Sequence, residues 1–244
     1  MNILSMRAED LPALRVEDVN RPLTPEEMVH LARIAGAFWI YDYEALKRGK
    51  AGMHAVLKSG RHSDGFFISR ILLALENIRL IISAQMTMRI MEALTGSDLP
   101  SCVAGVPDGA TKLGQDIGRA LGIPFLKMEK TDRISLLMPI NPKSLILLVE
   151  DFCTRGTGFT EAVNVIKASQ PLARFVPYNP VIINRGGLKR FAVENVGEFE
   201  ILPIVEHRVD DWEPEDCPLC AKGSVPIKPK ATDENWRLIT ASQL

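Results

Sequence analysis

The sequence predicts an α/β fold built on a doubly wound, mostly parallel sheet. Short apolar segments alternate with helical segments from residue 102 onward, as expected for strands joined by right-handed crossovers. One of these segments, Leu145–Glu150, is almost continuously apolar, which is typical of a parallel strand covered on both faces. The length of 244 residues is also sufficient to bury a sizeable core.

The N-terminal part predicts an irregular arm followed by a helix. Residues 1–23 show no sustained period. Thr24, Pro25 and Glu27 then supply the hydroxyl, proline and carboxylate that are typical of a helix start, and a helical period continues to about Lys47. We therefore expect residues 1–50 to form an N-terminal arm and helix.

The remaining elements follow from apolar periodicity and turn residues. A short run over 54–58 leads into a turn at Ser59-Gly60-Arg61, residues 66–68 predict a strand, and residues 75–94 predict a helix. The later expected strands are 102–106, 124–128, 145–150, 181–184 and 199–205, and the later expected helices are 110–121 and 159–168. We expect a main domain over 51–210 and a C-terminal extension with little periodicity over 211–244.

Composition excludes several classes of protein. Twenty-nine Lys and Arg balance 30 Asp and Glu, which argues against a nucleic-acid binder. An apolar content of 46% against 24% charged residues excludes a highly charged disordered chain. No apolar run approaches the roughly 20 residues of a membrane span, and neither a signal-peptide pattern nor a disulfide framework is present. We expect a cytoplasmic protein without a membrane or nucleic-acid partner.

The segment Leu145–Gly158 predicts a phosphate site. A buried strand delivers Glu150 and Asp151 to its carboxyl edge, where ligands bind in open α/β sheets. A short loop then opens a helix; this phosphate loop consists of Thr154, Arg155, Gly156, Thr157 and Gly158. Its backbone N–H groups, its hydroxyls and the helix N-terminus favour a phosphate monoester, while the two carboxylates could hold ribose hydroxyls or a metal-bound sugar phosphate.

The order of strand, acidic pair and Thr-x-Gly-Thr resembles the 5-phosphoribosyl-1-pyrophosphate (PRPP) signature of type I phosphoribosyltransferases. The stretch LKSGRHSDGFF, Leu57–Phe67, is similar to a motif of the orotate phosphoribosyltransferases. The resemblance implies that fold, with a small hood built partly from the N-terminal region. It also implies that Lys58 contacts the phosphate end of PRPP and that Phe66 and Phe67 form a wall against the pyrimidine.

Two further segments extend the resemblance. GVPDGATKLG, Gly105–Gly114, is similar to the pyrophosphate loop of the family, which implies that Lys112 binds PRPP and meets the leaving pyrophosphate. Arg185 stands where the family has an arginine that recognises the orotate ring and carboxylate. Here Asn184 precedes it in place of the more usual acid.

The family closes a mobile lid from a neighbouring subunit over PRPP. Leu126–Ser144 occupies that place, and Lys127, Lys130 and Arg133 are its expected cations. The segment contains no histidine or glycine and is largely apolar over 134–140, unlike the family's lid. The resemblance implies a homodimer in which Lys112, Asp151 and Lys130 are catalytic. It also implies Mg²⁺ held through PRPP, with no direct protein ligand.

The expected activity is transfer of ribose 5-phosphate from PRPP to orotate, giving orotidine 5′-monophosphate and pyrophosphate in pyrimidine nucleotide synthesis. Two alternatives stay open. Glu150-Asp151 replaces the family's commoner Asp-Asp, which leaves room for a PRPP-dependent transferase of another base. The altered lid leaves room for a non-catalytic PRPP- or nucleotide-sensing protein.

A lone CxxC lies in the C-terminal extension. Zinc at Cys217 and Cys220 would need one or two more ligands, and only His207 is near in sequence. We therefore favour a tight turn or a reduced thiol pair over a zinc site at this motif.

Overall fold

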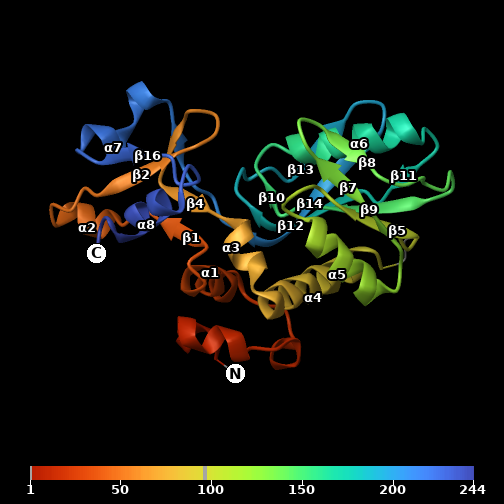
Figure 1. Cartoon of the computed structure of the whole chain (residues 1–244), viewed down its shortest axis with the longest axis horizontal. Helices are drawn as coiled ribbons and strands as arrows, with labels where there is room; N and C mark the ends of the chain where they lie inside the picture. Colours follow the sequence, from red (N-terminus) through yellow and green to blue (C-terminus); the bar gives the residue numbers. More distant parts are fainter. Residues whose placement is uncertain (1, 96–97) are drawn as a thin grey trace. The chain divides into compact units, whose positions relative to one another are not determined.

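The computed structural model describes residues 2–95 and 98–244 and divides the chain into two compact units (Figure 1). Unit 1 comprises Met1–Leu31 and Leu72–Arg208, and unit 2 comprises Ala32–Ile71 and Val209–Leu244. This division differs from the expected boundaries at residues 50 and 210. Residues 32–71 pack with the C-terminal segment because β2 (Met53–Val56) pairs in parallel with β16 (Val225–Ile227).

Unit 1 contains the mostly parallel sheet that the sequence predicts. One half has the strand order β11-β9-β5-β6, all parallel, and the other has the order β10-β12-β14-β13, in which only β13 is antiparallel. The bounds are β5 Cys102–Gly105, β6 Phe125–Leu126, β9 Leu145–Val149, β10 Phe152–Cys153, β11 Arg174–Phe175, β12 Tyr178–Asn184, β13 Arg190–Val193 and β14 Gly197–Glu206.

Two backbone hydrogen bonds join these halves into one sheet. The Glu150 amide donates to the Pro180 carbonyl, and the Ile182 amide donates to the Asp151 carbonyl; both distances are 3.0 Å. The chain that leaves β9 therefore runs on into β10 without leaving the sheet. As a result, the acidic pair is held in place by β12 rather than lying in a free loop.

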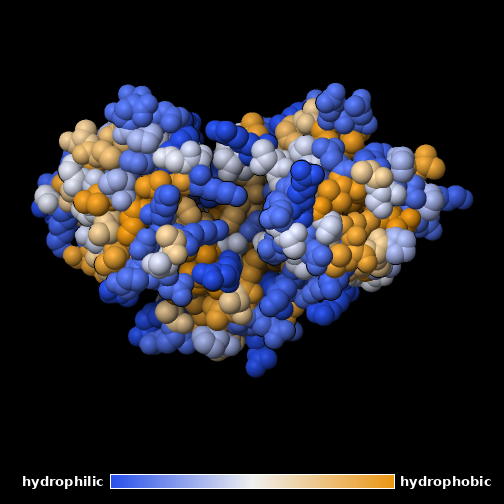
Figure 2. Space-filling model, turned by 45° about the horizontal axis from the view of Figure 1, so that its top comes forward, coloured by the Kyte–Doolittle hydropathy of each residue, from blue (hydrophilic) through white to orange (hydrophobic). Residues whose placement is uncertain are grey.

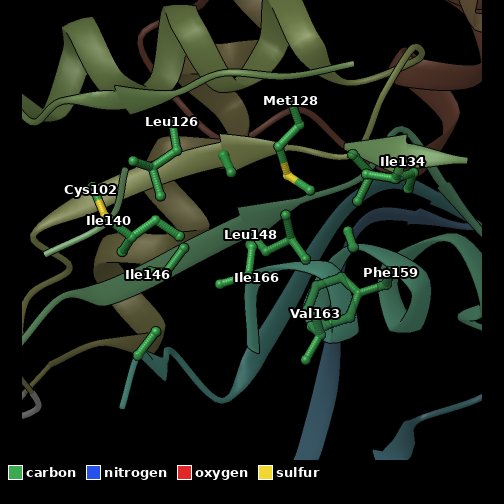
Figure 3. Close-up of a cluster of buried hydrophobic side chains, with 14 of the residues drawn as sticks. Cys102, Leu126, Met128, Ile134, Ile140, Ile146, Leu148, Phe159, Val163 and Ile166 are labelled. Atoms are coloured by element: carbon green, nitrogen blue, oxygen red, sulfur yellow. The ribbon is translucent and has the colours of Figure 1, made fainter. Parts of the chain in front are cut away.

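Helices cover both faces of this sheet. α4 (Glu76–Ala93) and α5 (Thr111–Leu121) lie on one face and α6 (Thr157–Ser169) lies on the other (Figure 1). Ile146 and Leu148 of β9 belong to the same buried cluster as Phe159 and Val163 of α6 (Figure 3). Leu147 is also fully buried, and successive strand residues point to opposite faces. Burial on both faces explains the continuous apolar run, and the predicted helices over 75–94 and 110–121 are confirmed.

The segment expected to be the lid forms a β-hairpin within unit 1. β7 (Met128–Lys130) pairs antiparallel with β8 (Ile134–Leu136). Met128 and Ile134 are buried in the core that includes α6 (Figure 3). The apolar character of this stretch therefore comes from packing against the domain.

The single helix expected up to Lys47 is wrong. The structure has α1 (Pro25–Ile34), then β1 (Phe38–Ile40), then α2 (Tyr43–Lys47). Gly36 adopts a φ of +68°, a left-handed conformation that ends the helix. The aromatic and β-branched residues that follow suit a strand, and they pair antiparallel with β4 (Gly65–Phe67).

The rest of unit 2 is a small sheet with short helices. The strand order is β15-β3-β2-β16, where β3 is His62–Ser63 and β15 is Asp211–Trp212. The C-terminal segment also contains α7 (Pro218–Ala221) and α8 (Asp233–Ala241), although its sequence shows little periodicity. Thr232 directly precedes α8 and caps it, because its hydroxyl oxygen accepts a hydrogen bond from the Asn235 amide.

The remaining elements are short. The N-terminal arm consists of three 3-10 turns, Ile3–Ser5, Ala8–Ala13 and Val16–Val19, and α3 (Ser69–Ala74) precedes α4. Within the described chain, no helix is both long and apolar enough to cross a bilayer. The face shown in Figure 2 is mostly hydrophilic, with hydrophobic groups between the polar ones.

Candidate functional site

The acidic pair lies at the carboxyl end of β9, and its two members have different surroundings. Glu150 is buried, and its Oε2 accepts a hydrogen bond of 3.2 Å from Nδ2 of Asn179 on the neighbouring strand β12. Burial raises the pKa of the Glu150 carboxyl to about 8, against the lowering effect of the Asn179 hydrogen bond. Glu150 is therefore largely neutral near neutral pH.

Asp151 is the more accessible carboxylate of the pair. It is half-buried, and its Oδ1 accepts a hydrogen bond of 2.9 Å from the amide of Phe152. A Cβ atom at Gly109 would overlap the Asp151 carboxylate, so the loop before α5 passes directly against this side chain. Glycine at position 109 permits that approach, which brings the expected pyrophosphate loop to the acidic pair.

The phosphate loop opens helix α6, as predicted. Gly156 is the residue before the helix and adopts a φ of +70°, while Thr154, Arg155 and Thr157 are exposed. Gly158 lies beside Glu150, because a Cβ atom there would come within 2.9 Å of Oε1. The N-terminus of a 13-residue helix therefore faces the acidic pair, and its N–H groups and dipole favour an anion.

Arg185 contacts the phosphate loop. Its Nη2 donates a hydrogen bond of 3.1 Å to Oγ1 of Thr154, and its Cζ lies 5.1 Å from the centroid of the Phe152 ring. Burial lowers the pKa of the guanidinium, with Asp151 acting in the opposite direction. Among the described residues, Arg185 Nε is buried without a hydrogen-bond partner. The structure thus adds a contact that the resemblance does not imply.

Lys112 lies in the first turn of α5 and is exposed. The loop that precedes it contains a cis peptide bond between Pro107 and Asp108. A Cβ atom at Gly105 would overlap the Ala110 carbonyl, so the loop folds back closely on the strand that it leaves. Lys112 and Asp151 therefore belong to two neighbouring loops at one edge of the sheet.

The expected lid cations lie on or beside the β7–β8 hairpin, and all three are exposed: Lys127, Lys130 and Arg133. Lys130 Nζ forms an ion pair of 2.7 Å with Oε2 of Glu161 on α6. Oε1 of the same carboxylate accepts from the Ile134 amide at 3.0 Å. Glu161 therefore attaches both strands of the hairpin to α6.

Three of the predicted residues belong to unit 2. Lys58 is exposed in the turn between β2 and β3. Phe66 and Phe67 on β4 are buried: Phe67 packs edge-on against Phe38 at 5.8 Å, and Phe66 lies 6.2 Å from the Trp236 ring. In this structure Phe66 belongs to the hydrophobic core of unit 2, and Phe67 is fully buried against Phe38.

Asn179 is a site residue that the sequence patterns do not identify. It is fully buried on β12 beside Glu150. It lies outside the phosphate loop and the other sequence motifs, and the local signal is limited to an amide residue just before an apolar run. Its role depends on the pairing of β12 with the chain after β9, which the sequence does not specify.

Comparison with known proteins gives a consistent result. No family model matches the sequence. The chain is 29% identical over 179 residues to an orotate phosphoribosyltransferase of Acidithiobacillus ferrooxidans, which covers 72% of this chain and 87% of the relative. It is 27% identical over 188 residues to an orotate phosphoribosyltransferase of Nitratiruptor, covering 72% and 90% respectively. Over most of its length the chain is therefore similar to orotate phosphoribosyltransferases.

Solved structures support the same fold. An orotate phosphoribosyltransferase from Aeropyrum pernix matches with a TM-score of 0.52 and 18% identity, over 73% of this chain and 93% of that one. The UMP synthase of Leishmania donovani matches with a TM-score of 0.54 and 14% identity, over 88% of this chain and 41% of that longer one. The predicted type I phosphoribosyltransferase fold is confirmed.

Proposed function

We propose that this protein transfers ribose 5-phosphate from PRPP to orotate, giving orotidine 5′-monophosphate and pyrophosphate in pyrimidine nucleotide synthesis. The observation that carries the proposal is the 29% identity to a curated orotate phosphoribosyltransferase across 87% of that enzyme's length. The site agrees with this chemistry, because an accessible carboxylate, a helix N-terminus and an exposed lysine lie at one edge of the sheet.

The reaction is a displacement at the anomeric carbon of ribose, so the protein must align two substrates and stabilise charge. The phosphate loop would hold the 5′-phosphate through its amides and through the hydroxyls of Thr154 and Thr157. Asp151 would accept hydrogen bonds from the ribose hydroxyls. Lys112 would neutralise the pyrophosphate as it departs.

Glu150 has a different part in this proposal from Asp151. Its carboxyl is buried and bonded to Asn179, with a pKa of about 8, so near neutral pH it offers mainly a neutral group. We assign it to supporting the loop at Gly158 and to a hydrogen bond with a ribose hydroxyl. Asp151 then supplies the negative charge of the pair.

Mg²⁺ is proposed to arrive with PRPP. The donor set fits an ion held mainly by substrate and water, because Asp151 is the one accessible carboxylate of the acidic pair. When bound, Mg²⁺ would neutralise the pyrophosphate charge. The chain's own residues would orient the sugar phosphate around it.

The remaining assignments come from the family resemblance. Lys58 is exposed, as a phosphate contact requires. A wall of Phe66 and Phe67 against the base requires exposed ring faces, and both rings are buried in this structure. Arg185 is proposed to bind the base as well as to support Thr154. A homodimer with the lid supplied by the partner subunit, and a cytoplasmic location, complete the proposal.

A binding and turnover panel tests the proposal. The purified chain would be incubated with PRPP and Mg²⁺ and with orotate, uracil, hypoxanthine or adenine in turn, and pyrophosphate release would be measured. We expect pyrophosphate release with orotate and with none of the other three bases. Turnover with a different base would identify another transferase, whereas PRPP binding without turnover of any base would identify a sensing protein.

A further inference from the structure

Four side chains with metal-binding atoms gather inside unit 2. His54 lies on β2, His62 on β3, Cys217 directly before α7 and Cys220 within it. Their ligand atoms all lie within 4.8 Å of one another. Three of these residues are buried, Cys220 is half-buried, and both cysteines are free thiols.

Four of the six distances among these atoms are close to the edges of a tetrahedral metal site. His54 Nε2 lies 3.0 Å from His62 Nδ1, 3.6 Å from Cys217 Sγ and 3.5 Å from Cys220 Sγ. Cys220 Sγ lies 3.3 Å from His62 Nδ1. Zinc bonds of about 2.0–2.1 Å to nitrogen and about 2.3 Å to sulfur place tetrahedral ligand atoms roughly 3.3–3.8 Å apart. A small outward movement would therefore admit the ion.

The orientation of His54 supports a role as a ligand. Its Nδ1 lies 2.9 Å from Ser224 Oγ, and the Ser224 hydroxyl donates its own proton to the Gly52 carbonyl at 3.2 Å. The serine oxygen is therefore left to accept a hydrogen bond from the Nδ1–H group of His54. This arrangement directs the lone pair of Nε2 toward the two sulfur atoms and His62. A hydrogen bond from the remote ring nitrogen is the usual way in which a metal-binding histidine is fixed.

We propose that His54, His62, Cys217 and Cys220 bind one structural zinc ion. Two sulfur and two nitrogen ligands in a tetrahedron select zinc, and four protein ligands leave no open position for catalysis. The ion would connect the β2–β3 hairpin to the C-terminal segment. Because unit 2 is assembled from two short, distant stretches of chain, the free energy of metal binding would stabilise its fold.

The residues close to this CxxC along the chain lead to a different expectation. Among them only His207 could be a further ligand, so the local sequence favours a tight turn or a reduced thiol pair. The structure instead supplies His54, which lies 163 positions from Cys217, and His62, which lies 158 positions from Cys220. In the absence of metal, the same four groups could pair through S–H···N hydrogen bonds, so the experiment must separate the two states.

The first test is the metal content of the full chain, purified under reducing conditions and measured by mass spectrometry. We expect one zinc per chain, with loss of zinc in Cys217→Ser and in Cys220→Ser. Cys102→Ser and His207→Gln are matched controls outside the cluster and should retain zinc. Loss of zinc from the controls to the same extent, or iron in place of zinc, would overturn the proposal.

The second test does not depend on the folding of any variant. Wild-type chain exchanged with Co²⁺ should show the visible bands of tetrahedral cobalt and a near-ultraviolet thiolate-to-cobalt charge-transfer band. Ser224→Ala, which removes the partner of His54 Nδ1, should weaken zinc affinity roughly 10–100-fold. A wild-type chain that binds neither metal stoichiometrically, or binds cobalt without the thiolate band, contradicts the site.

Discussion

Asn179 donates a hydrogen bond of 3.2 Å to the carboxyl of Glu150, and both side chains are buried between β9 and β12. The amide supplies one polar partner to a group that has lost most of its contact with water. That partner does not offset the cost of burial, since the pKa of Glu150 rises from its ordinary value of 4.5 to about 8.

This raised pKa predicts that stability falls as pH rises. Between about pH 4.5 and about 8, the unfolded chain releases a proton that the folded chain retains. The contribution of the Glu150 carboxyl to the free energy of unfolding is greatest below pH 4.5. It decreases as the pH rises through that interval and is lowest above about pH 8. Each tenfold difference in proton affinity between the folded and unfolded chain corresponds to about 1.4 kcal/mol.

We therefore expect Glu150→Gln to remove this dependence. Glutamine keeps an oxygen for Asn179 but has no proton to release. Thermal unfolding should show equal stability of variant and wild type below pH 4.5 and a growing advantage of the variant up to about pH 8. Glu198→Gln, at an exposed ion pair with Arg190, is the control. A difference in stability between Glu150→Gln and wild type that stays the same at every pH would contradict the raised pKa of Glu150.

Asp151→Asn should weaken PRPP binding while leaving the fold intact. The substitution keeps the shape beside Gly109 and removes the charge that is proposed to meet the ribose hydroxyls. Losing charge-assisted hydrogen bonds of about 1.5–3 kcal/mol corresponds to roughly a 10- to 100-fold loss of affinity. Titration calorimetry with PRPP and Mg²⁺ measures it, with the exposed Asp98→Asn as control. Unchanged affinity would remove Asp151 from the site.

Gly156→Ala should disturb the phosphate loop. The position combines a φ of +70° with a Cβ that would lie 2.9 Å from the Phe191 ring. Gly122→Ala is the matched control, because its φ of +66° is similar but a Cβ there meets nothing within 4 Å. Both should lose about 1–2 kcal/mol of stability from the left-handed backbone. Only Gly156→Ala should also reduce PRPP affinity, and equal affinities would show that the loop tolerates the shift.

How far the sequence predicts this site depends on the range of the interactions. The acidic pair, the phosphate loop and the start of α6 follow one another along the chain, so one strand-to-helix pattern contains them all. The bond between Asn179 and Glu150 needs the pairing of two strands that the sequence leaves open. The cluster of His54 with Cys217 needs the C-terminal segment to join residues 32–71, and no local pattern encodes that.

The wrong helix boundary at Gly36 has a local cause. An apolar residue at every third or fourth position continues through Phe38, so the periodicity alone extends the helix. Gly36 ends it, and pairing with β4 then draws Phe38 and its neighbours into a strand. Here tertiary pairing outweighs a helical pattern whose intrinsic preferences amount to less than about 1 kcal/mol per residue.

Arg185→Met should raise the Kd of PRPP by about tenfold, because one hydrogen bond to a charged donor is lost at the phosphate loop. Thr154→Val removes the acceptor of the same bond and should produce a similar change. Kd for PRPP and KM for orotate would be measured for both variants. An effect of Arg185→Met on orotate alone would show that the guanidinium serves the base and not Thr154.

The ion pair between Lys130 and Glu161 allows the lid proposal to be tested by two opposite substitutions. Lys130→Ala and Glu161→Gln both break the 2.7 Å contact. Such a half-exposed pair contributes about 0–1 kcal/mol, so both variants should fold. If Lys130 closes over PRPP, only Lys130→Ala should lower kcat, with PRPP affinity unchanged, because the charge acts late in the reaction. Equal effects on kcat would make the lysine a structural anchor of the hairpin.

Mixing chains then tests whether the lid acts on the partner's site. Lys130→Ala chains and Asp151→Asn chains should each be weakly active alone. A mixed dimer would contain one site with an intact Asp151 and a lid lysine donated by the other chain, so activity should return on mixing. Mass spectrometry of tagged chains confirms that subunits exchange. If exchange occurs and activity stays low, Lys130 serves its own subunit, which agrees with its contact to Glu161 on the same chain.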